Sequence, residues 1–254
     1  MKNNLFAFLL IAALNSAAAW GAGNEKSSLA VGFKYSSGNY GLASNTNILI
    51  VQLEGMYRTG SWAFGFAIPH VWITGRGVVL PNGIRSKAPP LFESTTYFGL
   101  GDIEAAATYN ILSQEENGTR VDLTGKVKFG SAEKNLGTGE NDYAAQVSLY
   151  RQLDRFTPAV TLGYETFGSP VGIKLNNAAY GILGGDYRIF EQRHAGFEFL
   201  LARKNSADGA GRRELTAYLD QDIGNDIHIR GYVLKGFSDG SPDGGFGITV
   251  VSYY

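Results

Sequence analysis

The chain has 254 residues, a formal net charge of −1 and no cysteine. Near-neutral charge argues against a nucleic-acid-binding surface, which would need a basic excess. The absence of cysteine excludes a disulfide framework, a cysteine-ligated metal and a lipidated cysteine. The chain holds 34 glycines and 14 tyrosines but only 7 prolines, which favours long strands joined by glycine-bearing loops.

The first residues have the pattern of an export signal. Lys2 is followed by the apolar stretch LFAFLLIAAL (residues 5–14) and then by the small residues Ala17, Ala18 and Ala19. This pattern predicts a signal peptide over residues 1–19 that is cleaved near Trp20, followed by one domain over residues 20–254. No later segment approaches eighteen uninterrupted apolar residues, so insertion into a membrane as a helix is not expected.

The stretch YFGLGDIEAAATYNIL (residues 97–112) places two carboxylates in an otherwise apolar run. Side chains alternate across a strand, so Asp102 and Glu104 share one face while Ile103, Ala105 and Tyr109 share the other. An unpaired carboxylate in a dry core costs several kcal/mol. The polar face of this strand is therefore expected to meet water or cations.

The same alternation recurs along the chain and predicts twelve strands. They are expected near residues 29–36, 49–58, 62–68, 97–112, 121–129, 142–153, 156–167, 177–189, 194–203, 212–222, 227–237 and 245–254. Several of them approach the ~9–11 residues that a tilted strand needs to cross a bilayer. Each strand has one apolar face and one polar or charged face.

Short and long connections alternate between the expected strands. Short turns are expected at residues 59–61, 113–118, 154–155, 191–192 and 224–226, and the intervening connections are longer. This alternation is typical of outer-membrane barrels. The predicted fold class is all-β, a transmembrane antiparallel up-and-down β-barrel of about 12 strands after a cleaved signal peptide, located in the bacterial outer membrane. The alternative is a water-soluble sandwich or lipocalin-like barrel, which would bury its apolar face inward.

Parity places charges of both signs inside such a barrel. The expected lumen-lining residues are Glu54, Arg58, Asp102, Glu104, Lys126, Lys128, Glu165, Glu198, Asp220, His228 and Arg230, with Tyr180, Tyr218 and Tyr232 among them. Two interpretations stay open, because twelve strands lie between the ~8 that side chains fill and the ~16 that leave an aqueous channel. The charges line a solute path, or they pair as a salt-bridged plug.

The longest expected loop covers residues 74–95 and contains three prolines. A loop of this length is usually functional or disordered. Its apolar side chains predict a cap over the mouth of the barrel, and the alternative is a mobile surface loop. These side chains are Val78, Val79, Leu80, Ile84, Leu91 and Phe92.

The last nine residues, FGITVVSYY, place Phe246, Ile248, Val250 and Tyr254 on the lipid face. This ending resembles the C-terminal insertion signal of outer-membrane proteins, which implies recognition by the barrel-assembly machinery. The alternative is an ordinary final strand with an interfacial tyrosine.

The sequence offers few candidates for catalysis. His70, His194 and His228 stand in the contexts HVW, HAG and HIR, and none forms the His-x-Ser pair expected of an outer-membrane phospholipase. No catalytic residue, metal site or cofactor is therefore predicted, and an outer-membrane hydrolase is the least favoured of the functions considered.

Three segments carry a family resemblance: WAFGFAIPHVWITG (residues 62–75), FGLGDIEAAATYNIL (98–112) and KFGSAEKNLGTGENDYAAQVSLYRQL (128–153). In this order they resemble the outer-membrane channel family associated with the meta-cleavage pathway of phenol degradation. The resemblance implies an outer-membrane barrel that contacts lipid and admits small hydrophobic or aromatic solutes. Long-chain fatty-acid channels are a neighbouring possibility, but they carry a substantial N-terminal plug.

Asp102 matches the Gly-Asp of this family, and Gly137 and Gly139 match its Gly-Thr-Gly. Asp102 is expected to face the lumen, and the two glycines are expected to adopt positive φ angles in a loop. The proline-rich loop of residues 74–95 has no counterpart in the family pattern.

Overall fold

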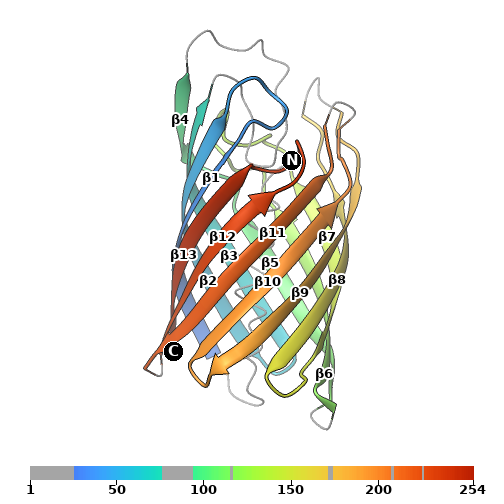
Figure 1. Ribbon diagram of the computed structural model, residues 1–254. Coiled ribbons are helices and arrows are strands. Elements are labelled where there is room, and N and C mark those ends of the chain that lie inside the picture. The colour runs from blue at the N-terminus through green and yellow to red at the C-terminus, as the bar shows by residue number, and fades with distance from the viewer. Residues whose placement is uncertain (1–25, 76–93, 115–116, 171–173, 207–208, 225) are drawn as a thin grey trace.

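The fold is described from a computed structural model, which covers residues 26–75, 94–114, 117–170, 174–206, 209–224 and 226–254. Antiparallel strands follow one another around a barrel (Figure 1). Their bounds are β1 Lys26–Gly38, β2 Thr46–Thr59, β3 Trp62–Gly75, β4 Thr95–Leu100, β5 Glu104–Gln114, β6 Thr119–Lys128, β7 Asp142–Arg151, β8 Phe156–Thr166, β9 Ala178–Phe190, β10 Arg193–Ala202, β11 Arg212–Ile223, β12 Ile227–Gly236 and β13 Gly244–Tyr253.

The sheet closes on itself. β1 pairs with β13 from Ser28 opposite Tyr253 to Ser37 opposite Gly244, and it pairs with β2 along its other edge. β2 in turn pairs with β3, so both ends of the strand order meet. Closure gives every strand except β4 a partner on both edges, and such pairing satisfies the backbone N–H and C=O groups as a lipid environment requires.

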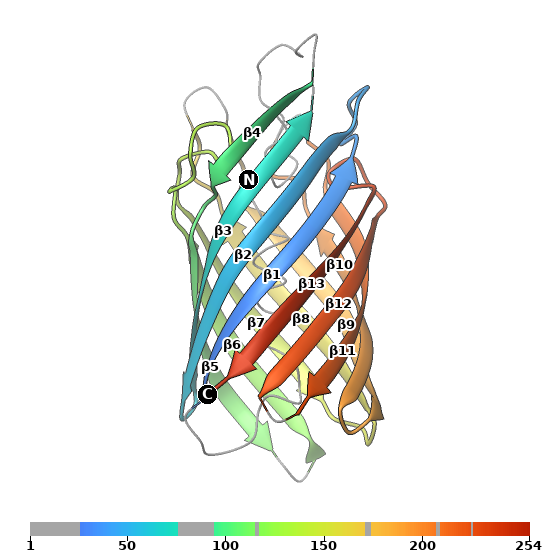
Figure 2. The same cartoon turned by 90° about the vertical axis from the view of Figure 1, so that its left-hand side faces the viewer.

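The expected strand over residues 97–112 is interrupted at residues 101–103. β4 and β5 lie one after the other beside β3, with Thr95–Leu100 opposite the end of β3 and Glu104 onwards opposite its beginning. Figure 2 shows β4 beside β3 at one end of the barrel. The 13 strands therefore occupy twelve positions around the wall, as the alternation predicts. The cause of the interruption is a loop that docks there, described below.

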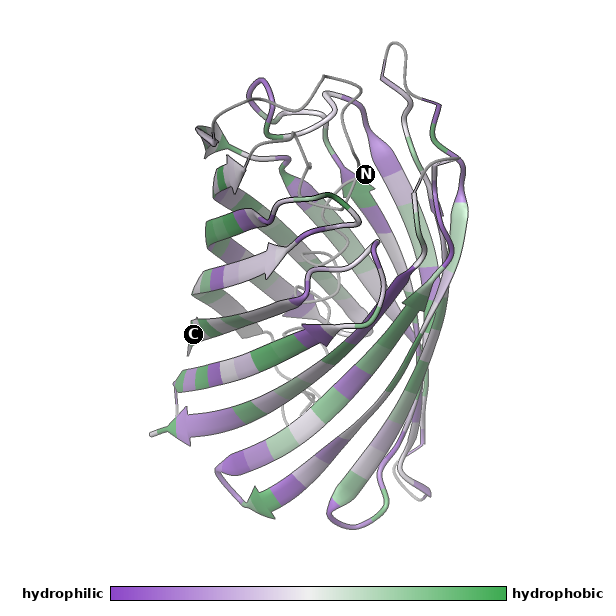
Figure 3. Ribbon diagram, turned by 45° about the horizontal axis from the view of Figure 1, so that its top comes forward, coloured by the Kyte–Doolittle hydropathy of each residue, from purple (hydrophilic) through white to green (hydrophobic). Residues whose placement is uncertain are grey.

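The wall is apolar outside and polar inside, as the exposed apolar and buried polar side chains show. Hydrophobic and hydrophilic residues alternate along its strands (Figure 3). Leu29, Val31 and Phe33 of β1 are 38–54% exposed. Lys34, which follows Phe33 and points to the other face, is 2% exposed. This distribution is the reverse of a soluble barrel, which buries its apolar face. The water-soluble alternative is therefore wrong, and the outer surface matches the hydrocarbon of a bilayer.

The two ends of the barrel differ in their connections. β2–β3, β7–β8, β9–β10 and β11–β12 are joined by short turns at the end where the chain also reaches Tyr254 (Figure 1). Gly60, Asp154 and Gly224 adopt positive φ angles in these turns. By the convention of outer-membrane barrels this is the periplasmic end, and the longer connections lie at the extracellular end. Within the described residues, no helix is long and apolar enough to span a membrane.

Candidate functional site: the lumen

The structure places every sequence-predicted lumen residue on the inner face. Glu54, Arg58, Asp102, Glu104, Lys128, Glu165, Asp220 and Arg230 are buried, and Lys126, Glu198 and His228 are half-buried. The assignment of faces is therefore confirmed. Whether these side chains line a solute path stays a prediction.

Ion pairs run along the wall between neighbouring strands. Lys34 of β1 lies 3.3 Å from Glu54 of β2. Gln52 Nε2 donates to the same carboxylate at 2.8 Å. Arg120 pairs with Asp122 on its own strand. Such pairs satisfy the charges locally, so these side chains need no partner from the far wall.

The periplasmic end holds a network of carboxylates, histidines and one arginine. Arg230 of β12 makes two bonds of 2.6 Å to Asp220 of β11. His228 Nδ1 lies 2.6 Å from Asp222 Oδ1, and its Nε2 lies 3.5 Å from Asp220 Oδ1. His194 Nδ1 of β10 lies 2.7 Å from Asp186 Oδ1 of β9 and stands opposite Asp220 in the register. The network therefore extends from β9 to β12.

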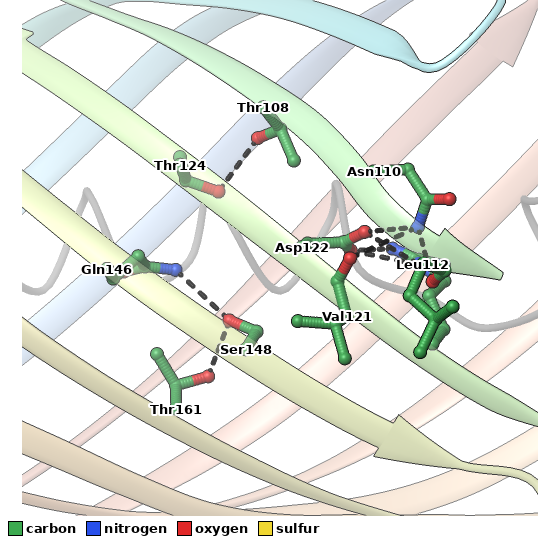
Figure 4. A network of polar contacts seen from close by, with 10 residues as sticks. Thr108, Asn110, Leu112, Val121, Asp122, Thr124, Gln146, Ser148 and Thr161 are labelled. Atoms are coloured by element: carbon green, nitrogen blue, oxygen red, sulfur yellow. Dashed lines mark hydrogen bonds and ion pairs between the residues drawn. The ribbon is translucent and has the colours of Figure 1, made fainter.

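Side-chain hydrogen bonds join β5 to β6 and β7 to β8 on the inner face (Figure 4). Thr108 and Thr124 share a hydrogen bond of 2.9 Å between β5 and β6. Ser148 of β7 bonds Thr161 of β8 at 2.8 Å. Side-chain hydrogen bonds of this kind keep a polar wall satisfied within the barrel.

Three inner tyrosines each face a glycine on the neighbouring strand: Tyr180 is paired with Gly163, Tyr218 with Gly196 and Tyr232 with Gly247. A Cβ added at Gly163 would lie 2.2 Å from the Tyr180 ring. The ring therefore rests on the wall where the glycine leaves room. The hydroxyl of Tyr180 donates to Gln146 Oε1 at 2.8 Å, which keeps this ring along the wall.

An apolar patch interrupts the polar lining at the extracellular end. Ile48 and Ile50 of β2 contact Val71 and Ile73 of β3, all on the inner face, and Tyr97 and Ala132 pack at the margin. Leu136, from the β6–β7 connection, packs on this patch and is 1% exposed. The patch is thus buried beneath the β6–β7 connection, and its four side chains are at most 4% exposed.

The β6–β7 connection, residues 129–141, folds against the interruption between β4 and β5. The Ala132 N–H donates to Asp102 Oδ1 at 3.1 Å, and the Ile103 N–H donates to Ser131 Oγ at 2.9 Å. Glu133 accepts from the Leu100 N–H at 3.0 Å through its side chain. These bonds take the place of strand pairing, which explains why the strand breaks at residues 101–103.

Lys128 joins this loop to the barrel. Its Nζ lies 2.8 Å from Asp142 Oδ2 and 3.3 Å from Asp102 Oδ2, and all three side chains are at most 7% exposed. Asp142 also accepts from the Gly168 N–H at 3.0 Å. Asp102 therefore organises a loop and does not stand open in the lumen.

Sequence reasoning missed the loop that docks beside Asp102. Asp142, Glu133 and Leu136 carry the docking, and the signal available for them was the joint presence of GLGD and FGSAEKNLGTGEND in the sequence. The register sets Glu104 opposite Lys128 and Ala106 opposite Lys126, so Lys126 is the diagonal neighbour of Glu104.

The expectation for the two loop glycines is half right. Gly139 has a φ of 72°. Gly137 does not have a positive φ angle. Glycine is needed there because the space is too small for a side chain: a Cβ would lie 2.4 Å from the Ala132 Cβ and 2.7 Å from Asp102 Oδ2.

A second inward contact forms at the β1–β2 connection. Tyr40 lies there with a φ of 50° and is buried. Burial, together with the nearby Glu214, raises the pKa of Tyr40, so its hydroxyl stays neutral. Arg212 Nε donates to Glu214 Oε1 at 2.8 Å at the same end of the barrel.

The remaining predicted residues have mixed outcomes. Phe246, Ile248, Val250 and Tyr254 are 43–76% exposed on the outer face, as expected, while their role as an assembly signal stays a prediction. The loop-cap residues Val79, Leu80, Leu91 and Phe92 and the signal peptide lie outside the described residues. In the part of the chain that is described, no group of three His, Asp or Glu side chains is arranged to hold a metal ion.

No family model and no curated protein matches this chain. Solved structures do match it. An outer-membrane channel from Pseudomonas putida F1 is 11% identical with a TM-score of 0.70, covering 94% of this chain and 98% of that one. A NanC porin is 13% identical with a TM-score of 0.59, covering 89% and 99%.

The translocator domain of the autotransporter NalP from Neisseria meningitidis is 10% identical with a TM-score of 0.52, covering 97% of this chain and 94% of that one. Solute channels and a translocator domain thus share this architecture, and at such identities the likeness concerns the fold alone. The chain has the fold of bacterial outer-membrane β-barrels.

Proposed function

We propose that this protein is a passive channel of the bacterial outer membrane that admits small hydrophobic or aromatic solutes. The observation that carries the proposal is the apolar patch of Ile48, Ile50, Val71 and Ile73, which faces inward at the extracellular mouth. The patch is covered by Leu136 of the β6–β7 connection, so a solute reaches it when this connection moves away from the wall. An apolar solute gains free energy by leaving water for such a surface.

The pairing of charges supports a channel over a plug. Lys34 pairs with Glu54 and Arg230 with Asp220, in each case on neighbouring strands. Charges satisfied along the wall leave the axis of the barrel to solvent and solute. A salt-bridged plug would instead place the partners on opposite walls.

The resemblance to channels associated with phenol degradation makes phenol the first solute to test. The signal peptide over residues 1–19 and outer-membrane placement belong to the same proposal, because a barrel of this kind reaches its membrane only after export. Two of the solved structures that match are a channel and a porin, which supports a role without catalysis.

The test is single-channel conductance of the purified full-length protein in a planar bilayer, with and without phenol. We expect steady conductance that phenol reduces as it occupies the mouth. Silence in the bilayer would contradict the channel, and conductance that phenol leaves unchanged would contradict recognition of an aromatic solute.

Two adjacent residues give a matched pair of variants. Ile50→Thr replaces an apolar side chain of the inner patch, whereas Val51→Thr makes a similar change on the outer face, where Val51 is 37% exposed. We expect Ile50→Thr to weaken block by phenol and Val51→Thr to leave it unchanged. Equal effects would show that the patch does not contact the solute.

A further inference from the structure

Three basic side chains lie on the outer surface at the extracellular end of neighbouring strands. Arg203 directly follows β10, Arg213 is the second residue of β11, and Lys235 is the second-last residue of β12. All three are exposed. Their odd-numbered parity matches Leu201, Leu215 and Val233, which are 38–61% exposed on the same outer face. We call these three residues the basic row.

The register brings the basic row together. Leu201 stands opposite Arg213. Arg203 lies two residues beyond Leu201 on the same face, which makes it a diagonal neighbour of Arg213. Leu215 stands opposite Lys235, which makes Lys235 diagonal to Arg213 on the other side. Diagonal neighbours on one face lie within ~7–8 Å, a distance that long side chains span.

The surface beside the basic row is apolar and aromatic. Phe237, whose N–H donates to the Arg213 carbonyl at 2.9 Å, is 54% exposed. Its ring centroid lies 6.5 Å from that of Phe199, a contact that reaches across β11. Leu201 and Leu215, which stand opposite Arg213 and Phe199, belong to the same surface and are 49% and 38% exposed. Acyl chains would lie against these side chains.

The basic row makes no ion pair with a described residue. Asp239 is exposed in the connection after β12, and it also forms no ion pair within the described ranges. Each cation is thus presented to the headgroup layer beside an apolar wall. Phosphate is the matching anion, since the Arg guanidinium binds it through parallel hydrogen bonds.

We propose that the basic row binds the phosphorylated headgroup of an outer-leaflet glycolipid, a phosphorylated glucosamine lipid of the lipid A type. Arg203, Arg213 and Lys235 bind the phosphates, and the acyl chains pack on Phe199, Phe237 and Leu215. The inference rests on the outer-membrane placement given above and not on channel activity. A negative result for lipid binding would therefore leave the channel proposal standing, and a silent bilayer would leave the lipid proposal standing.

The test is equilibrium binding of fluorescent bis-phosphorylated lipid A to the purified full-length barrel in neutral detergent. Each Lys or Arg near an anionic lipid surface contributes about fivefold in affinity, so the triple variant Arg203→Gln/Arg213→Gln/Lys235→Gln is expected to bind about 100-fold more weakly. Dephosphorylated lipid A should bind the wild type as weakly as it binds the variant.

A matched control removes the same charge at the other end of the barrel. Arg151, Arg155 and Arg193 are exposed at the periplasmic end, and their triple change to Gln should leave lipid A binding unchanged. If the control variant also lost lipid A binding, the effect would depend on net charge alone, and the assignment of the site to the basic row would be overturned. Equal binding of the dephosphorylated lipid would also overturn it, as would displacement of lipid A by inorganic phosphate alone.

The wild type provides a readout that does not depend on variants. Binding should weaken with rising salt, because exposed charges are screened. Single variants at Arg213 and Lys235, each checked for the heat-modifiable migration of a folded barrel, keep the test informative if the triple variant does not fold. Wild-type affinity that is independent of salt would contradict phosphate recognition.

Discussion

Replacing Lys128 by Met tests the loop-docking site most directly. The change removes the cation that lies 2.8 Å from Asp142 and 3.3 Å from Asp102, and both carboxylates have 2% exposed side chains. Breaking a buried pair by removing one partner costs about 3–5 kcal/mol. Because Asp102 keeps the hydrogen bond from the Ala132 N–H and Asp142 keeps that from the Gly168 N–H, we expect a loss near the lower limit, about 3 kcal/mol.

The assay is urea unfolding in lipid vesicles, followed by tryptophan fluorescence. Lys134→Met is the matched control, since Lys134 lies in the same loop and is exposed; a surface charge there contributes about 0–1 kcal/mol. In the double variant Lys128→Met/Asp142→Asn the loss should be smaller than the sum of the single losses, because the double change leaves one buried carboxylate instead of two.

The same variant should also change the channel. With Lys128 removed, Asp102 repels Asp142, and the bond from the Ala132 N–H to Asp102 weakens. Single-channel recordings should then show larger current fluctuations as residues 129–141 leave the wall. The reasoning is refuted if Lys128→Met costs no more than Lys134→Met and records an unchanged current.

Three further predictions follow from the wall. Ala105→Arg puts a charge in lipid and should lower the free energy of unfolding by about 2–4 kcal/mol, whereas Ala106→Arg faces the lumen and should cost less; equal losses would contradict the assignment of faces. Gly163→Ala should cost about 1–3 kcal/mol by displacing the tyrosine ring that rests on it, while Gly125→Ala, where a Cβ meets open space, should cost less than 1 kcal/mol in the same unfolding assay. Deletion of Tyr254 should reduce the amount of folded barrel in cell envelopes, and an undiminished amount would contradict the assembly signal.

Alternation along the strands was sufficient to predict the barrel. Side chains of a strand point alternately to its two faces, so the faces of Glu54, Glu104 and Arg230 follow from parity alone. The alternation of short and long connections likewise predicted the strand count and the two ends. These properties depend on nearest neighbours in the chain, which is why they can be read from the sequence without a fold.

Partnership across strands is different, because it depends on register. A shift of one residue in either strand changes which side chains meet. The sequence indicated that Asp102 and Lys128 share a lumen, but only the tertiary structure decided that Lys128 holds both Asp102 and Asp142. The diagonal row of Arg203, Arg213 and Lys235 was likewise invisible until the register was known.

The interruption of the fourth strand shows the same limit most clearly. Residues 97–112 alternate well enough to predict one continuous strand, although Gly99 and Gly101 are weak strand formers that favour a strand end. The break exists because a loop some thirty residues later supplies hydrogen bonds to Leu100, Asp102 and Ile103. The sequence by itself determined which face each side chain takes, since that is local geometry. The tertiary structure decided where the loop docks, since contacts distant in sequence form only when the whole wall has closed.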